Sequence, residues 1–165
     1  MPELFVVRNA TVADALTLAH HRAGMFRDMG VLPEQLSAPL VEASHRYFQD
    51  ALASGEYVGW LASPAADSDK IIAGAGVQRH SVLPHPGVGG RGIILGVQGV
   101  VLNVYTEPTW RRRGLAALLM QHVLEWAEAN KAKSLVLHAS ADARPLYEKL
   151  GFVPTNEMQY TGGRT

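Results

Sequence analysis

Residues 110–116 read WRRRGLA, three consecutive arginines that run into a glycine. Before them stands VQGVVLNVYTE at 97–107, a β-rich segment, and after them the leucines of 115–126 recur at helical spacing. A strand, a turn and a helix in this order place free backbone N–H groups at the start of the helix, where an anion binds well. Gly114 has no Cβ, so the backbone there can approach a phosphate closely. The stretch predicts a strand–loop–helix unit and a candidate phosphate-binding loop.

The arginines alone also fit two other interpretations. One is a solvated charge run ahead of a capped helix, which the residues by themselves leave open. The other is a contact with RNA or DNA. Lys plus Arg and Asp plus Glu number 15 each, so the net charge is zero, and Trp110 is the one aromatic residue beside the arginines. Nucleic-acid binding needs many cations or interleaved aromatic residues, so no nucleic-acid partner is expected.

Length and composition favour one domain over residues 1–165. Cysteine is absent, which excludes disulfides, thiolate nucleophiles and cysteine-ligated zinc. The N-terminal residues lack the pattern of a signal peptide, and no apolar run reaches the roughly 18 residues of a membrane span. We therefore expect a cytoplasmic protein with no membrane partner.

Periodicity predicts a β-α-α-β-β-β-α-β-α-β order. The expected strands lie at 4–8, 56–63, 70–82, 97–107, 133–139 and within 152–161. The expected helices cover 11–30, 33–54 with a break or kink near Ser37–Ala38 caused by Pro39, a segment from 115, and a short one capped by Asp142. Residues 81–92, rich in proline and glycine, are predicted as a loop. The predicted α/β sheet has strands of mixed direction. The first strands are antiparallel, and the two strands that flank the arginines and the following helix are parallel.

The pattern Arg111-x-x-Gly114-x-Ala116 resembles the [RQ]-x-x-G-x-[GA] loop of the GCN5-related N-acetyltransferase (GNAT) superfamily. The downstream LHASADARPLYEKLGF, 137–152, is similar to the closing segment of the same family, and the motif match covers about residues 100–153. The resemblance implies an α/β GNAT fold: a mixed, mostly antiparallel sheet with a splayed parallel strand pair and about four helices.

The resemblance also implies the activity. The expected function is transfer of an acetyl group from acetyl-CoA to a primary amine of a small molecule or peptide, with no metal. A non-catalytic acetyl-CoA sensor is the alternative, and a homodimer is one expected assembly. The strand before the loop would bind the pantetheine arm, and the loop the pyrophosphate. The implied cofactor-binding residues are Val104, Tyr105, Thr106, Arg111, Arg112, Arg113, Gly114, Leu115, Ala116 and Ser140.

By the same resemblance, Tyr147 is the general acid that protonates the sulfur of coenzyme A, and its phenol is protonated at neutral pH. A core tyrosine is the alternative. Glu107, at the end of the central strand, is the first candidate for the general base, against a surface carboxylate that pairs with the adjacent arginines. His80 and His138 are further candidates, and water can also carry the proton.

Acceptor specificity is expected in the first two helices and the 83–97 segment. Met25 and Phe26 are the candidate substrate-binding residues, and the alternative is that both pack in the core. The pairs His20-His21 and His80 with His85 lack the spacing of a metal site and have no completing carboxylate, so no metal ligands are predicted.

Overall fold

The computed structural model describes residues 3–132 and 134–162. Its strands form one sheet in the order β1-β2-β3-β4-β5, in which neighbours are antiparallel except for the parallel pair β4 and β5. They are β1 (Phe5–Asn9), β2 (Tyr57–Pro64), β3 (Ala73–Pro86), β4 (Ile93–Thr106) and β5 (Ser134–Leu137). The predicted sheet of mixed direction is confirmed.

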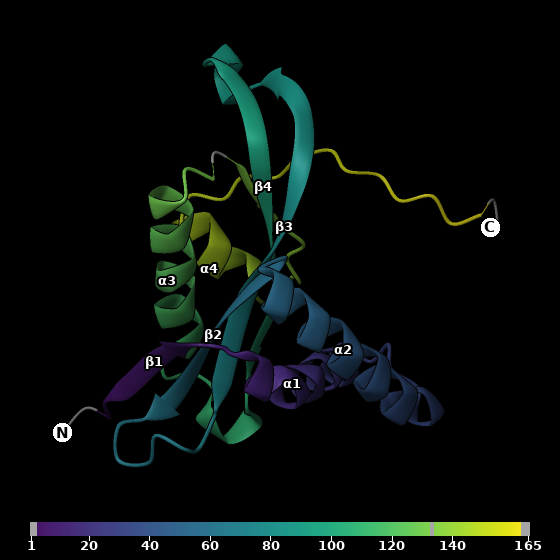
Figure 1. Ribbon diagram of the computed structural model, residues 1–165, viewed down its shortest axis with the longest axis vertical. Coiled ribbons are helices and arrows are strands. Elements are labelled where there is room, and N and C mark those ends of the chain that lie inside the picture. Colours follow the sequence, from purple (N-terminus) through teal and green to yellow (C-terminus); the bar gives the residue numbers. More distant parts are fainter. Residues whose placement is uncertain (1–2, 133, 163–165) are drawn as a thin grey trace.

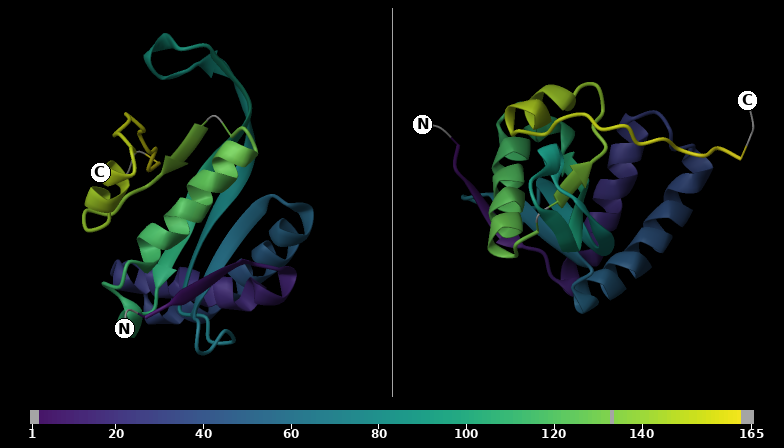
Figure 2. Two further views of the ribbon diagram at one scale, coloured as in Figure 1. Left: turned by 90° about the vertical axis from the view of Figure 1, so that its left-hand side faces the viewer. Right: turned by 90° about the horizontal axis from the view of Figure 1, so that it is seen from above.

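Helices cover both faces of the sheet (Figures 1 and 2). On one face lie α1 (Ala15–Asp28) and α2 (Glu34–Ser54); on the other lie α3 (Leu115–Ala129) and α4 (Arg144–Lys149). Short 3₁₀ turns η1 (Val12–Asp14), η2 (Val88–Gly90) and η3 (Pro108–Trp110) complete the order of elements. Among the described residues, no helix combines the length and apolar character that crossing a membrane requires.

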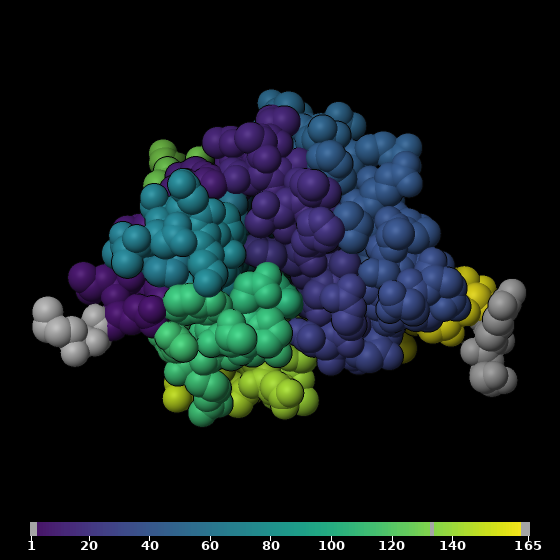
Figure 3. All heavy atoms as spheres, turned by 90° about the horizontal axis from the view of Figure 1, so that it is seen from below, coloured from purple at the N-terminus to yellow at the C-terminus, as the bar shows by residue number. Residues whose placement is uncertain are grey.

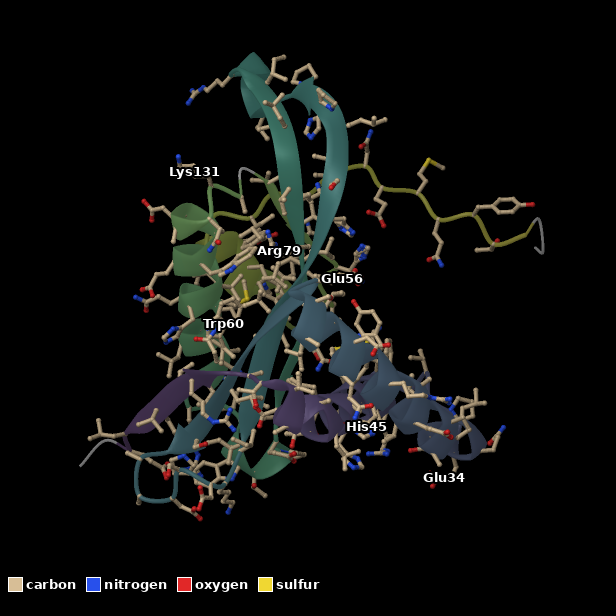
Figure 4. The ribbon with its side chains drawn as sticks, in the orientation of Figure 1. Glu34, His45, Glu56, Trp60, Arg79 and Lys131 are labelled. Carbon is tan, nitrogen blue, oxygen red and sulfur yellow. The ribbon has the colours of Figure 1, made fainter. Side chains whose placement is uncertain are left out.

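Side chains of β2 alternate between the two layers, as the pleat of a strand requires. Tyr57 and Leu61 pack against α1 and α2. Trp60 points the other way, toward α3, where its ring meets that of Trp126 edge to face at 6.3 Å (Figure 4). The sheet is therefore buried on both faces at its centre.

Close packing on the α1 side depends on a glycine of β3. A Cβ at Gly76 would lie 2.0 Å from the hydroxyl of Tyr57, which is too close for any side chain. The absence of a side chain at this position lets the Tyr57 ring lie flat across β3 and brings α1 and α2 close to the sheet.

Three expectations about these elements are wrong. Helix α2 runs unbroken through Pro39, because this proline lies one turn after the start on an exposed surface, where water can satisfy the carbonyl that it frees. The first half of the predicted loop at 81–92 is strand: β3 and β4 continue past the body as a paired arm that turns at 87–92 (Figure 1). Pro84 fits because it falls at a register shift, where no ladder hydrogen bond is needed.

The third wrong expectation is the last strand. Residues 152–161 form no strand in the described part of the chain, although their sequence alternates as a strand does. Strand β5 pairs with β4 along one edge, and the described residues offer no partner along the other.

The 3₁₀ turn η1, which leads into α1, carries the predicted capping box. The Asp14 carboxylate accepts a hydrogen bond from the Thr11 amide at 2.8 Å and two from the Arg8 guanidinium, each at 2.8 Å. These bonds, led by that from Arg8, lower the pKa of Asp14 below its ordinary value. This contact joins β1 to the start of α1.

We expect Asp14→Asn to lower the free energy of unfolding at pH 7 by about 1 kcal/mol, since it weakens both the cap and the ion pair. Because the pKa of Asp14 is lowered in the folded state, its contribution is present at neutral pH and is lost as the pH falls through that lowered value. Denaturant unfolding at pH 7 and pH 3 should show the gap between wild type and variant narrowing. Exposed Asp50→Asn is the matched control, and an equal gap at both pH values would contradict the prediction.

Candidate functional site

Strand β4 continues beyond the point where its pairing with the edge strand β5 ends. Their pairing runs from Gln98 beside Ser134 to Val101 beside Leu137, yet β4 continues to Thr106. Against β3, Leu102 pairs with Gly76 and Tyr105 with Gly74, so β4 carries one extra residue there. Such a bulge bends a strand. The edge of β4 that faces β5 is therefore open from the bulge to its end.

The bulge is centred on Asn103, which has a left-handed φ of 60° and is 2% exposed. Its side-chain amide donates a hydrogen bond to the carbonyl of Leu18 in α1 at 3.1 Å, and its Oδ1 has no partner among the described residues. The sequence analysis did not select Asn103. The available signal was a lone amide side chain inside the apolar run VVLNVY.

The loop that follows β4 presents free backbone donors. From Arg112 to Ala117, no N–H group has an acceptor among the described residues. Arg112 and Gly114 have left-handed φ values of 65° and 79°, while Arg113 between them does not. Alternation of this kind makes a concave set of N–H groups that suits an anion, and the start of α3 adds its positive end. We call residues 112–117 the amide cradle.

The arginine side chains beside the cradle are occupied elsewhere. Arg111 pairs with Asp28 at the end of α1 and donates to the carbonyl of Thr106 at 3.0 Å. Arg113 pairs with Glu3 and lies over the ring of Trp110, 4.7 Å from its centre. The carboxylates that face the arginines are thus Asp28 and Glu3, rather than Glu107.

These contacts place the loop at the surface beside α1. Figure 3 shows residues near 110, in green, next to the purple α1 and the yellow-green segment that leads into α4. Arg112 is exposed, and the described residues include no ion-pair partner for it. The charge run is therefore largely neutralised, and the donors that remain free are backbone amides.

Tyr147 of α4 is buried, with 7% of its surface exposed, and packs in one cluster with Val101 and Leu115. Val104, beyond the bulge, packs against the same cluster. Burial raises the pKa of Tyr147 above its ordinary value, so its hydroxyl is protonated at neutral pH. The predicted acid, Val104 in the open part of β4 and the first residue of α3 therefore share one hydrophobic cluster.

The start of α4 differs from the prediction. The helix begins at Arg144 with Ala143 at its N-cap, so Asp142 is not the cap. Ser140 takes that role in part, because its hydroxyl accepts a hydrogen bond from the amide of Ala143 at 3.3 Å. Pro145 lies in the first turn, where no N–H is needed.

The candidate bases differ in their surroundings. Glu107 is half-buried at the end of β4, and its amide donates to the carbonyl of Ile72 at 2.9 Å. His80 is exposed on β3, and His138 is exposed beyond β5, with its Nε2 3.2 Å from Glu157. The described residues contain no group of three or more histidine, aspartate or glutamate side chains arranged to hold a metal.

A histidine that the sequence analysis placed only in a rejected metal pair proves to be part of the core. His21 is 3% exposed, and its ring lies 5.1 Å from that of Tyr105. Burial lowers its pKa to about 4, so it is neutral at pH 7. Met25 and Phe26, farther along α1, belong to neither core cluster, and Arg22 lies over the Phe26 ring at 4.9 Å.

Comparison with solved structures finds the same architecture. A GCN5-related N-acetyltransferase from Ralstonia eutropha is 27% identical with a TM-score of 0.82, covering 95% of this chain and 97% of that one. A predicted acetyltransferase from Clostridium acetobutylicum, solved with acetyl-CoA, is 28% identical with a TM-score of 0.78, covering 96% of each chain. Glucosamine-6-phosphate N-acetyltransferase from Arabidopsis thaliana shares the fold at 16% identity and a TM-score of 0.68, covering 98% of this chain and 100% of that one.

Curated protein sequences include no significant match to this chain. The family model of the acetyltransferase (GNAT) domain, in contrast, matches residues 31–165, which is most of the sequence. The splayed strands and the loop motif agree with that match. The chain belongs to the GNAT family of acetyltransferases.

Proposed function

We propose that this acetyltransferase acts as a single cytoplasmic domain and transfers the acetyl group of acetyl-CoA to a primary amine of a small molecule or peptide. The observation that carries the proposal is the amide cradle, which follows the open edge of β4 after the short turn η3. The C. acetobutylicum relative, which was solved with acetyl-CoA, supports the choice of ligand.

The residues present fit the cofactor. The backbone amides of the cradle, among them those of Arg112, Arg113, Gly114, Leu115 and Ala116, would hold the pyrophosphate. Arg111 would act indirectly, because its side chain already joins β4 to α1.

The pantetheine arm would lie along the open edge of β4, where Val104, Tyr105 and Thr106 have backbone groups that β5 leaves unpaired. The hydroxyl of Ser140 accepts one hydrogen bond from Ala143, so it keeps its own proton to donate to the cofactor.

Acetyl-CoA supplies the acyl group and a thiol leaving group. The neutral acceptor amine attacks the thioester carbonyl carbon, the C–N bond forms and the C–S bond breaks. The amine loses a proton and the departing sulfur gains one. Tyr147 is the proposed donor to sulfur, since burial keeps its hydroxyl protonated. Glu107 is the proposed acceptor of the amine proton, directly or through water, because no arginine side chain pairs with it among the described residues.

The acceptor is proposed to contact Met25 and Phe26. Both lie on α1, whose last residue, Asp28, pairs with Arg111, the residue just before the cradle. Because neither side chain is part of a core cluster, both are available to line an acceptor pocket.

Acetyl-CoA alone should raise the melting temperature of the protein by several degrees, as a ligand well above its dissociation constant does. A panel of polyamines, aminoglycosides, amino acids and peptide N-termini should then include an amine that releases free thiol. Stabilisation without thiol release from any amine would indicate a sensor instead. No stabilisation by acetyl-CoA would refute both functions.

Gly114→Val should weaken acetyl-CoA binding about 100-fold, because the left-handed φ disfavours a β-branched residue and its side chain obstructs the cradle. Arg112→Gln should weaken binding less than about tenfold, since an exposed charge contributes little. Isothermal titration measures both, after thermal unfolding shows that each variant folds. A loss at Arg112 equal to or larger than that at Gly114 would reverse the assignment.

Tyr147→Phe should lower kcat about 100-fold and leave KM nearly unchanged, because it keeps the buried ring and removes only the proton donor. Steady-state thiol release with the best acceptor tests this. Tyr47→Phe is the matched control, since Tyr47 lies on α2, where its hydroxyl contacts Gln78 and Glu56, and the variant should retain full activity. An unchanged kcat in the Tyr147 variant would show that the residue has a packing role only.

A further inference from the structure

Arg22 of α1 differs from the other cationic side chains of the molecule. It is half-buried, whereas every other arginine and lysine in the described part of the chain is exposed. Arg22 follows Leu18 by one helical turn, so the two side chains lie on the same face of α1. Leu18 is fully buried in the core cluster that contains Tyr57, so this face is turned toward the sheet. A cation is therefore held beside the core.

The guanidinium of Arg22 has no counter-charge within the described residues, where no carboxylate forms an ion pair with it. Two acids of this side of the sheet have other partners. Glu56, where α2 leads into β2 (Figure 4), accepts a hydrogen bond from the Tyr47 hydroxyl at 3.4 Å, and Asp28 pairs with Arg111. A half-buried cation without a partner costs free energy, which an anionic group of a ligand would recover.

A second donor without a partner lies near Arg22. The hydroxyl of Tyr57 is buried and has no acceptor among the residues that the structure describes. Burial raises the pKa of Tyr57, and the charge of Arg22 acts in the opposite direction, because the guanidinium lies near the phenol. A guanidinium and a phenolic O–H are both donors that suit an oxyanion, such as a carboxylate or a phosphate.

These donors lie level with the opening of β4. The Tyr57 hydroxyl lies across Gly76 of β3, since a Cβ at that glycine would be 2.0 Å from it. Gly76 pairs with Leu102, which is the first residue of β4 beyond its pairing with β5. The ring of Phe26, a proposed acceptor contact, lies 4.9 Å from the Arg22 guanidinium. Arg22 is therefore on the side of the sheet where the acceptor is proposed to bind.

We propose that Arg22 binds an anionic group of the acceptor, a carboxylate or a phosphate, while an amine of the same molecule is acetylated. The fork of the guanidinium can form two parallel hydrogen bonds to such a group, and Tyr57 offers a further O–H donor. This inference rests on the proposed acetyl transfer and narrows its acceptor class. Amino acids, peptides with a nearby carboxylate and phosphorylated amines are favoured over polyamines and aminoglycosides, which carry no anionic group.

Acceptor pairs that differ only in the anionic group test the inference by steady-state thiol release. The pairs are amino acids with their amides, and O-phosphoethanolamine with ethanolamine. In at least one pair, the wild type should have a kcat/KM at least about tenfold higher for the anionic member, as a charge-assisted hydrogen bond provides. Arg22→Gln should lower this ratio about tenfold. The pair that responds distinguishes a carboxylate from a phosphate.

Arg22→Met is the second variant where Arg22→Gln does not fold, because it also removes the charge and keeps an unbranched side chain. Arg27→Gln is the matched control. Arg27 is exposed on α1 and donates to the Ser37 hydroxyl at 3.1 Å, so its substitution should leave the ratio unchanged. A wild type without preference in any pair overturns the inference, although acetyl transfer to neutral amines then still stands. A ratio that neither Arg22 variant lowers, or that Arg27→Gln lowers equally, also overturns it.

Equilibrium binding decides the inference where no amine releases thiol, a result that would refute the acetyl-transfer proposal itself. The same pairs are then titrated calorimetrically into the protein with coenzyme A present. An anionic member should bind the wild type at least about tenfold more tightly than it binds Arg22→Gln. Equal affinity for the two proteins, or no binding of any anionic member, overturns the inference.

Discussion

The bulge at Asn103 is the constraint on which the rest of the structure depends. One extra residue in β4, held in a left-handed conformation, ends the pairing with β5 at Val101 and leaves the remainder of β4 open. The same side chain hydrogen-bonds to the carbonyl of Leu18, so the bend and the position of α1 are fixed together. A straight β4 would continue to pair with β5 and close the opening ahead of α3. An asparagine suits this position because it tolerates a positive φ and offers a polar group to a neighbouring helix.

Much of the fold follows from local sequence. The strand before WRRRGLA, the amphipathic helix after it and the capping box at Thr11 depend on neighbouring residues, and the structure confirms them. The wrong predictions concern segments whose structure is determined by contacts with distant residues or with solvent. Pro39 looked like a helix break, but water can satisfy the carbonyl that it frees. The proline- and glycine-rich arm remains paired because the register shift accommodates Pro84. Residues 152–161 have a strand pattern, yet a strand forms only where the backbone pairs with a neighbouring strand, and these residues make no such pairing in the described part of the chain.

The predictions for the candidate site also depend on whether the residues involved are close in sequence. The loop, Gly114 and Tyr147 were predicted from a motif that resembles a known family, and such a motif consists of residues close in sequence. The partners of the arginines could not be found so. Asp28 lies 83 positions from Arg111, and Glu3 lies 110 positions from Arg113. Nothing in a local pattern encodes such distances. The acceptor-binding face is harder still, since the packing of α1 and α2 decides which of its side chains are left outside the core.

The pairing of Arg111 with Asp28 and of Arg113 with Glu3 changes what the loop can discriminate. Because two of the three arginines of the loop are neutralised, the cradle would contact a ligand mainly through peptide dipoles whose directions the backbone fixes. Attraction between mobile charges is insensitive to shape and is screened by salt, whereas fixed dipoles favour a group whose oxygens match their spacing. The cradle would therefore distinguish anions by their shape more than by their charge. Its selectivity would change little with ionic strength.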